Sequence, residues 1–236
     1  MRERNNIDMK ILAIDTSSFP ASVAITEDDL LLGEYIIRNQ RKHSQNIMVM
    51  TECLFDSLGM DISEIDVFAV TVGPGSFTGL RIGISSVRAF AQAMKKKVVA
   101  VNTLEALAYN TLQRNGIVIP MLDARRDEVF TALYEINNGT VAEIAPPCVM
   151  TIDEICDKYK DKKAILVGDG AIIHRGEFGN SFAFAPMNLM ETRASSLAMA
   201  AYAKAKKNDL CHYNEVEPMY LRKSQAEREY EGRNNK

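Results

Sequence analysis

The same order of elements occurs twice along the chain, and this repetition constrains the fold more than any other feature. The apolar run at residues 11–14 ends in Asp15, and the run at residues 117–122 ends in Asp123. A short apolar run bounded by turn-forming residues is typical of a buried strand. In each half, hairpin strands follow the acid, and helices then alternate with strands. The sequence therefore predicts an α/β fold with two lobes of related build.

The bounds of the two lobes follow from this order. We expect an N-terminal lobe at residues 9–104, a C-terminal lobe at 105–222, a flexible leader at 1–8 and a charged tail at 223–236. Strands are expected at 10–15, 21–26, 30–38, 67–72, 98–101, 117–122, 129–136, 141–145 and 164–167, the first three as an antiparallel meander. Helices are expected at 45–58, 80–94, 104–114, 152–159 and 195–207. Lobes of this kind occur in the actin, hexokinase and Hsp70 (ASKHA, RNase H-like) superfamily, which by itself does not fix function.

The composition argues against several classes of function. The formal net charge is -3, whereas a protein that holds nucleic acid alone usually carries a basic surface. Any contact with nucleic acid would therefore need a partner. The four cysteines form no CxxC pair and are expected to be reduced thiols of a cytoplasmic protein. No apolar run is long enough to cross a membrane.

Two segments of the first half could hold a phosphate group. Asp15, Thr16 and Ser17 follow a strand directly, where a carboxylate and hydroxyls can hold a metal-bound phosphate or can form a turn. Gly73 and Gly75 begin a glycine-rich segment that ends at Gly79, before a helix whose N-terminal amides favour an anion. The segment lacks the lysine of a Walker A loop. A tight loop that packs on the sheet is the alternative.

The second half offers weaker candidates of the same kind. Asp123 could correspond to Asp15, but no glycine follows it closely, and residues 123–127 are better explained as a solvated cluster of charges. Gly168 and Gly170 resemble the glycine turn that meets adenosine in the superfamily. A plain turn between strand and helix explains them equally well.

Two helices carry apolar or small residues on more than one side, whereas a surface helix needs one apolar stripe. In the helix at 45–58, one stripe includes Ile47 and Leu54, and Met48 and Phe55 lie on another side. The helix at 80–94 has a second face of mostly small residues, which permits close approach of another helix. Either these helices bury both sides within one domain or they meet another chain. The expected interface residues are Ile47, Met48, Met50, Thr51, Leu54, Phe55, Arg81, Ile82, Ser85, Ser86, Ala89 and Ala93.

Several segments resemble the TsaB (YeaZ) family, which serves the biosynthesis of threonylcarbamoyladenosine in tRNA. Residues 72–83 carry the most specific likeness, and residues 9–17, 120–127, 168–171 and 218–222 also resemble the family. The likeness thus extends from about residue 9 to residue 222, which is nearly the whole chain.

The resemblance implies a role without catalytic residues. Family members join the homologous subunit TsaD through the two helices described above, and pair with themselves in the same way when TsaD is absent. TsaD carries the metal and transfers the threonylcarbamoyl group to adenosine 37 of tRNAs that read codons beginning with A. An ATPase, TsaE, binds across the pair, and the resemblance allows ATP or ADP at an interface shared within the complex. We expect this chain to contact tRNA only through the complex, and expect neither a metal nor a cofactor of its own.

Two alternatives remain open at this point. An active sugar kinase or ATPase of the superfamily would need a working phosphate loop in the second lobe, and the sequence after Asp123 argues against one. A metallopeptidase would need metal ligands, and the wide spacing of His43, His174 and His212 offers no recognisable set.

Overall fold

The first half of the chain forms a mixed five-stranded sheet. The computed structural model describes residues 8–38 and 43–222. The strands of the first sheet are β1 (Lys10–Asp15), β2 (Ala21–Glu27), β3 (Leu30–Ile37), β4 (Val67–Gly73) and β5 (Lys97–Asn102). They lie in the order β3-β2-β1-β4-β5, with β1, β2 and β3 antiparallel and with β4 and β5 parallel to β1. The predicted meander of the first three strands is confirmed.

The second half repeats this topology. Its strands are β6 (Gly116–Asp123), β7 (Glu128–Asn137), β8 (Thr140–Thr151), β9 (Ile165–Val167) and β10 (Ala183–Phe184), in the order β10-β9-β6-β7-β8. The central strand β6 is antiparallel to β7 and parallel to β9, as β1 is to β2 and β4. Each central strand ends in an aspartate, Asp15 or Asp123. The prediction of two related α/β lobes is therefore confirmed.

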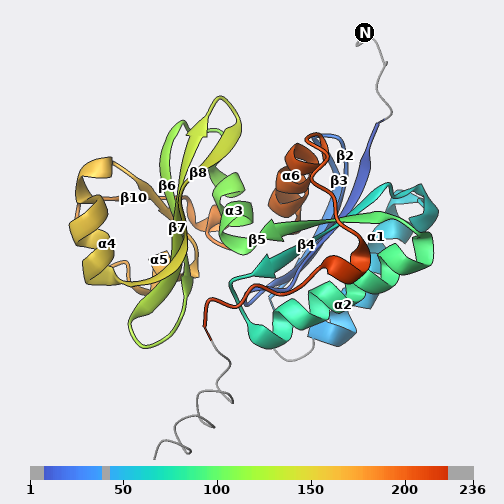
Figure 1. The fold of residues 1–236 in the computed structure, drawn as a ribbon, viewed down its shortest axis with the longest axis horizontal. Coiled ribbons are helices and arrows are strands. Elements are labelled where there is room, and N and C mark those ends of the chain that lie inside the picture. Colours follow the sequence, from blue (N-terminus) through green and yellow to red (C-terminus); the bar gives the residue numbers. More distant parts are fainter. Residues whose placement is uncertain (1–7, 39–42, 223–236) are drawn as a thin grey trace, which may run out of the picture.

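Helices cover the faces of both sheets. The α-helices are α1 (His43–Leu58), α2 (Phe77–Met94), α3 (Thr103–Ala108), α4 (Ile152–Tyr159), α5 (Asp169–Ile173) and α6 (Ala194–Ala205). Short 3₁₀ turns occur at Ile62–Glu64, Tyr109–Thr111, Lys160–Lys162, Met187–Leu189 and Tyr213–Glu215. Figure 1 shows α3 and α6 between the two sheets, with α1 and α2 on the far side of the first sheet and α4 on the far side of the second.

The outer face of the first sheet is closed by α1 and α2. Ile47 and Leu54 of α1, together with Ile84 and Val87 of α2, pack in one cluster against strand residues such as Phe68. Each of these side chains is almost fully buried, which stabilises the fold by about 1.5–3 kcal/mol per residue. Both helices are thus held to the sheet by one apolar side, and their other sides face outward.

The inner face of the first sheet is covered by α6, although α6 belongs to the second half of the sequence. Leu197 and Ala201 pack against Ile11 and Ala13 of β1. Beyond α6, the backbone N–H of Met219 donates to a β4 carbonyl group. Residues 194–219 therefore lie on the first sheet. We expected a boundary at 104/105 with all of 105–222 in the second lobe, and this boundary does not describe the packing. The reason is that β1 and β4 need a second layer, which only a returning segment supplies.

The bounds of α2 and α3 differ most from the predictions, while the ends of α1 and α6 shift by one or two residues. The second helix, α2, begins at Phe77 rather than at Leu80, because Ser76 caps it within the glycine-rich segment. The third, α3, ends at Ala108 rather than at Arg114, because the chain tightens into a 3₁₀ turn. The predicted charged tail at 223–236 and residues 1–7 of the predicted leader lie outside the described residues.

Candidate partner interface

The glycine-rich segment between β4 and α2 is closed by hydrogen bonds to the turn that follows β1. The Oγ of Ser76 accepts a hydrogen bond from the backbone N–H of Gly79 at 3.2 Å. The N–H of Ser76 donates to the carbonyl group of Ser17 at 2.7 Å, and Oγ1 of Thr16 donates to the carbonyl group of Gly79 at 2.8 Å. The start of α2 is therefore braced against the first strand of the sheet.

This close packing explains why the segment needs glycine. A Cβ atom on Gly75 would lie closer than 3.0 Å to the carbonyl oxygen of Ser17, and a Cβ atom on Gly79 would lie as close to that of Thr16. The space in front of both glycines is thus filled by oxygen atoms of the chain itself. A carbonyl oxygen is a hydrogen-bond acceptor, so it offers nothing to an anion. No room is left for a phosphate group in front of Gly75 or Gly79.

Asp15 also serves the packing of this region. Its Oδ1 accepts hydrogen bonds from the N–H of Ser17 at 2.8 Å, from the hydroxyl group of Ser17 at 2.6 Å and from Oγ1 of Thr71 at 2.8 Å. Its side chain is 1% exposed, and Oδ2 has no hydrogen-bond partner among the described residues. The arrangement is that of a buried turn acceptor, the structural alternative that the sequence left open.

The corresponding turns of the second lobe are packed in the same way. A Cβ atom on Gly168 would approach the carbonyl oxygen of Met121 closer than 3.0 Å. Between Gly168 and Gly170, Oδ1 of Asp169 accepts a hydrogen bond from the N–H of Asp123 at 3.0 Å. Burial raises the pKa of Asp169 above its ordinary value of 3.8, and the hydrogen bond from Asp123 opposes that shift. This glycine turn connects β9 to α5, packs against the end of β6 and leaves no space in front of either glycine.

The structure corrects the predicted interface residues of α1. Five of them are less than 9% exposed: Ile47, Met50, Thr51, Leu54 and Phe55. The four apolar ones belong to the core of the first lobe, and the hydroxyl group of Thr51 donates to the carbonyl group of Ile47 in the same helix. They cannot face a partner in this fold. The sequence showed two apolar sides, but Phe55 lies with Ile47 and Leu54 on the buried side that closes the first sheet, whereas Met48 faces outward.

The remaining predicted residues do lie on the outside of the two helices. Met48 of α1 is 53% exposed, and next to it Val49 is 57% exposed. On α2, Ile82 and Ser86 are partly exposed. We call the outward sides of α1 and α2 the helical face; its residues are Met48, Val49, Cys53, Thr78, Arg81, Ile82, Ser85, Ser86, Ala89 and Ala93.

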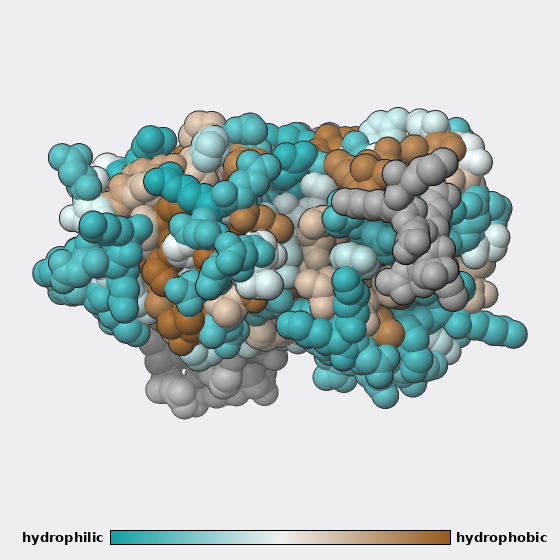
Figure 2. Space-filling view, turned by 90° about the horizontal axis from the view of Figure 1, so that it is seen from above, coloured by the Kyte–Doolittle hydropathy of each residue, from teal (hydrophilic) through white to brown (hydrophobic). Residues whose placement is uncertain are grey.

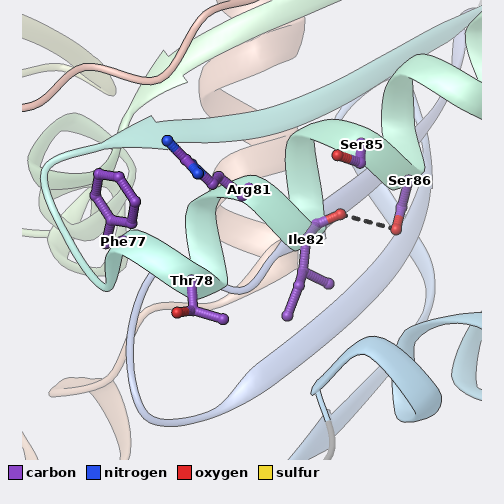
Figure 3. A pocket seen from close by; sticks show the side chains of 6 residues that line it. All are labelled: Phe77, Thr78, Arg81, Ile82, Ser85 and Ser86. Atoms are coloured by element: carbon purple, nitrogen blue, oxygen red, sulfur yellow. Dashed lines mark hydrogen bonds between the residues drawn. The ribbon is translucent and has the colours of Figure 1, made fainter.

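A hollow of about 530 Å³ lies on the α2 part of this face. Figure 3 shows its lining residues: Phe77, Thr78, Arg81, Ile82, Ser85 and Ser86. Arg81 extends beside the ring of Phe77, while Thr78 and Ile82 project from another side of the helix. The hydroxyl group of Ser86 is turned back onto the helix, where it donates to the carbonyl group of Ile82 at 2.9 Å. The hollow combines one cation with apolar and hydroxyl groups.

Sequence reasoning missed five residues of this region. Val49 and Cys53 are exposed. They are four residues apart and lie next to the polar residues Glu52 and Asp56, and this pattern could have placed them on the outer side of α1. Phe77 and Thr78 were assigned to the loop before α2. The fifth, Tyr220, has its ring stacked on Phe77 with the centroids 4.5 Å apart. No local pattern could have joined Tyr220 to a helix that begins 143 positions earlier.

The distribution of apolar residues over the surface does not by itself mark an interface. Figure 2 shows apolar areas over both lobes, separated by hydrophilic residues. Within residues 8–38 and 43–222, no helix has the length and apolar character needed to span a membrane. Across the same described residues, no three His, Cys, Asp or Glu side chains are grouped so that they could hold a metal ion. The helical face remains the feature that calls for a functional explanation.

Known proteins resemble this chain over most of its length. The family described as "TsaD: tRNA N6-adenosine threonylcarbamoyltransferase" matches residues 31–230. The "tRNA threonylcarbamoyladenosine biosynthesis protein TsaB" of Bacillus subtilis (strain 168) is 32% identical over 169 residues, which cover 71% of this chain and 74% of the relative. The protein of the same name from Escherichia coli (strain K12) is 35% identical over 129 residues, 54% of this chain and 55% of the relative.

The solved structures agree with these relatives. YeaZ from Pseudomonas aeruginosa has a TM-score of 0.81 and 26% identity, with 90% of this chain and all of that chain covered. The ROK hexokinase of Thermus thermophilus, with a TM-score of 0.52 and 11% identity, shows the shared fold alone. A tRNA N6-adenosine threonylcarbamoyltransferase from Kosmotoga olearia is 34% identical, but only 39% of its length is matched. The sequence, the repeated topology and these relatives together establish that the chain belongs to the TsaB (YeaZ) family.

Proposed function

We propose that this chain is the non-catalytic partner of TsaD in the synthesis of threonylcarbamoyladenosine in tRNA. In this proposal it binds TsaD through the helical face and activates the transfer of the threonylcarbamoyl group to the adenosine, without supplying a catalytic residue. The exposed helical face is the observation that carries the proposal. The names of the relatives from Bacillus subtilis and Escherichia coli, which refer to this biosynthesis, support it.

The chemistry of the helical face suits a helical partner. Met48 and Val49 expose large apolar side chains, whose removal from water would favour association. Ala89 and Ala93 on α2 are small and exposed, so that a second helix could approach at the short end of the usual 8–10 Å interaxial range. A face of this kind also allows two copies of this chain to pair when TsaD is absent, and we include that homodimer in the proposal.

The closed glycine segments support the absence of catalysis by this chain alone. Carbonyl oxygens of Thr16 and Ser17 fill the space directly in front of Gly79 and Gly75, which leaves no room there for a phosphate. We therefore propose that ATP or ADP binds only at a surface shared with other subunits, and that TsaE is the further partner. The net charge of -3 is consistent with indirect contact to tRNA in the cytoplasm.

A binding measurement with charged variants tests this proposal. Isothermal titration would compare purified TsaD against the wild-type chain, Val49→Arg and Ile82→Arg. An arginine buried without a counter-charge costs about 3–5 kcal/mol, so the affinity should fall by more than about 100-fold. Ile173→Arg is the matched control, because Ile173 is equally exposed, at 59%, but lies on the second lobe.

The outcomes separate clearly. Loss of binding in both helical-face variants, with Ile173→Arg binding like the wild type, supports the interface. Wild-type affinity in Val49→Arg and Ile82→Arg would contradict it, and a wild-type chain that does not bind TsaD at all would overturn the proposed function.

A further inference from the structure

Arg81 is held in place by two aromatic rings from distant parts of the chain. Its guanidinium carbon lies 4.1 Å from the centroid of the Phe77 ring, and its Nε donates a hydrogen bond to the hydroxyl group of Tyr220 at 3.1 Å. The rings of Phe77 and Tyr220 are stacked on each other, with an angle of 22° between their planes. A long exposed side chain that would otherwise sample many rotamers is thereby fixed in one position.

Tyr220 is itself fixed by the segment that carries it. The backbone N–H of Met219 donates to the carbonyl group of Val72 at 2.7 Å. The carbonyl oxygen of Met219 also packs so closely against Gly73 that it fills the place of a Cβ atom on that residue. On the other side, Arg222 donates to the carbonyl group of Ala124 at 2.8 Å and forms an ion pair with Glu128. This segment runs from the first lobe to the second and passes the N-terminus of α2 (Figure 1). Tyr220 is therefore held from both sides.

The guanidinium group of Arg81 still has donors to offer. Only Nε has a hydrogen-bond acceptor within the described part of the chain, and no acidic side chain there forms an ion pair with Arg81. Both terminal nitrogens remain for a ligand. The other residues that line the hollow are neutral, so an anionic group that pairs with Arg81 inside the hollow would belong to another molecule.

The geometry favours a carboxylate as that group. A guanidinium group presents parallel N–H donors that match the two oxygens of a carboxylate, and such paired bonds are stronger than neutral hydrogen bonds. Ser85, one helical turn after Arg81, places a hydroxyl group at the same hollow, where it can donate to a bound anion. Because Arg81 is already ordered, binding would not have to restrict its rotamers, and this preorganisation favours affinity.

We propose that Arg81, positioned by Phe77 and Tyr220, is a preformed receptor for a carboxylate of TsaD. The inference rests on the proposed function, and it adds the C-terminal segment to the partner interface. Tyr220 is a positioning residue in this scheme: it holds Arg81 and does not itself need to contact the carboxylate.

The test is the affinity for purified cognate TsaD at two salt concentrations. Arg81→Gln should lower the affinity by at least about tenfold, and most of the salt dependence of binding should disappear with it. Arg81→Lys should restore little, because an ammonium group cannot form the paired bonds. Tyr220→Phe keeps the ring stack but removes the hydroxyl acceptor, and should lower the affinity by about threefold without changing the thermal midpoint. Arg114→Gln, at an exposed arginine away from the helical face, is the charge-matched control.

The inference and the proposed function can fail separately. If the wild type binds TsaD and Ile82→Arg does not, but Arg81→Gln binds like the wild type with the same salt dependence, the receptor for a carboxylate is wrong and the interface stands. Full rescue by Arg81→Lys would also overturn it, because a point charge would then suffice. If the wild type does not bind TsaD, the proposed function itself fails.

Discussion

Replacement of Gly79 by alanine tests whether the glycine-rich segment is a brace or an open cradle. In an unobstructed helix, alanine in place of glycine stabilises by up to about 1 kcal/mol. Gly79 is buried, however, and its new Cβ atom would lie closer than 3.0 Å to the carbonyl oxygen of Thr16. The start of α2 would have to move away from the β1 turn. Such overpacking costs about 1–3 kcal/mol.

The displacement would also disturb two hydrogen bonds between these segments, from Thr16 to Gly79 and from Ser76 to Ser17. Each contributes about 1 kcal/mol. We therefore expect Gly79→Ala to lower the free energy of unfolding by about 2–4 kcal/mol after the gain in helix propensity is included. The measurement is urea unfolding followed by circular dichroism, with the slope of the transition checked for two-state behaviour.

Gly176→Ala is the matched control for this experiment. Nothing lies within 4 Å of a Cβ atom at Gly176, so the free energy of unfolding should change by no more than about 0.5 kcal/mol. A Gly79→Ala protein at least as stable as the wild type would refute the reasoning. The space in front of Gly79 would then be open, and a phosphate site at this segment would have to be considered again.

Three further predictions follow from buried groups. Leu54→Arg should unfold the protein rather than only weaken binding, because Leu54 is 2% exposed in the core; a folded Leu54→Arg protein, detected by circular dichroism, would contradict this. Asp15→Ala should lower the free energy of unfolding by about 2–4 kcal/mol, because Ser17 and Thr71 lose their hydrogen-bond acceptor. The folded variant should still support tRNA modification. A stable Asp15→Ala protein without that activity would indicate a phosphate role. Asp169→Asn should gain stability relative to the wild type as the pH rises from about 4 to 7. The reason is that the pKa of Asp169 is raised in the folded protein, so ionisation of this buried carboxyl group disfavours the folded state. A difference in unfolding free energy that stays constant with pH would show that the carboxyl group is not perturbed.

Much of the fold could be predicted because its signals are local. The apolar runs that end in Asp15 and Asp123 gave both central strands, and turn residues set the bounds of the hairpins around them. The position of α6 could not be predicted in this way. Its alanines suit a buried helix between two sheets, but nothing in residues 194–205 says which sheet they meet. That choice depends on which sheet lacks a second layer.

The candidate site was only partly predictable for a related reason. Periodicity identified α1 and α2, but it could not tell a wide buried side from two separate sides, so Leu54 and Phe55 were assigned to the interface. Ser76 was not recognised as a cap because it lies within a segment that reads as a loop. Tyr220 joins the helical face only through the tertiary path of the C-terminal segment.

Reconstituted tRNA modification tests the central claim most directly. TsaD, TsaE and a threonylcarbamoyl-adenylate donor would be incubated with tRNA, with and without this chain, and modified adenosine would be measured. We predict modification only when the chain is present, with no ATP hydrolysis or modification by the chain alone. Turnover of ATP by the chain alone, or equal modification in its absence, would contradict the assignment as a non-catalytic partner.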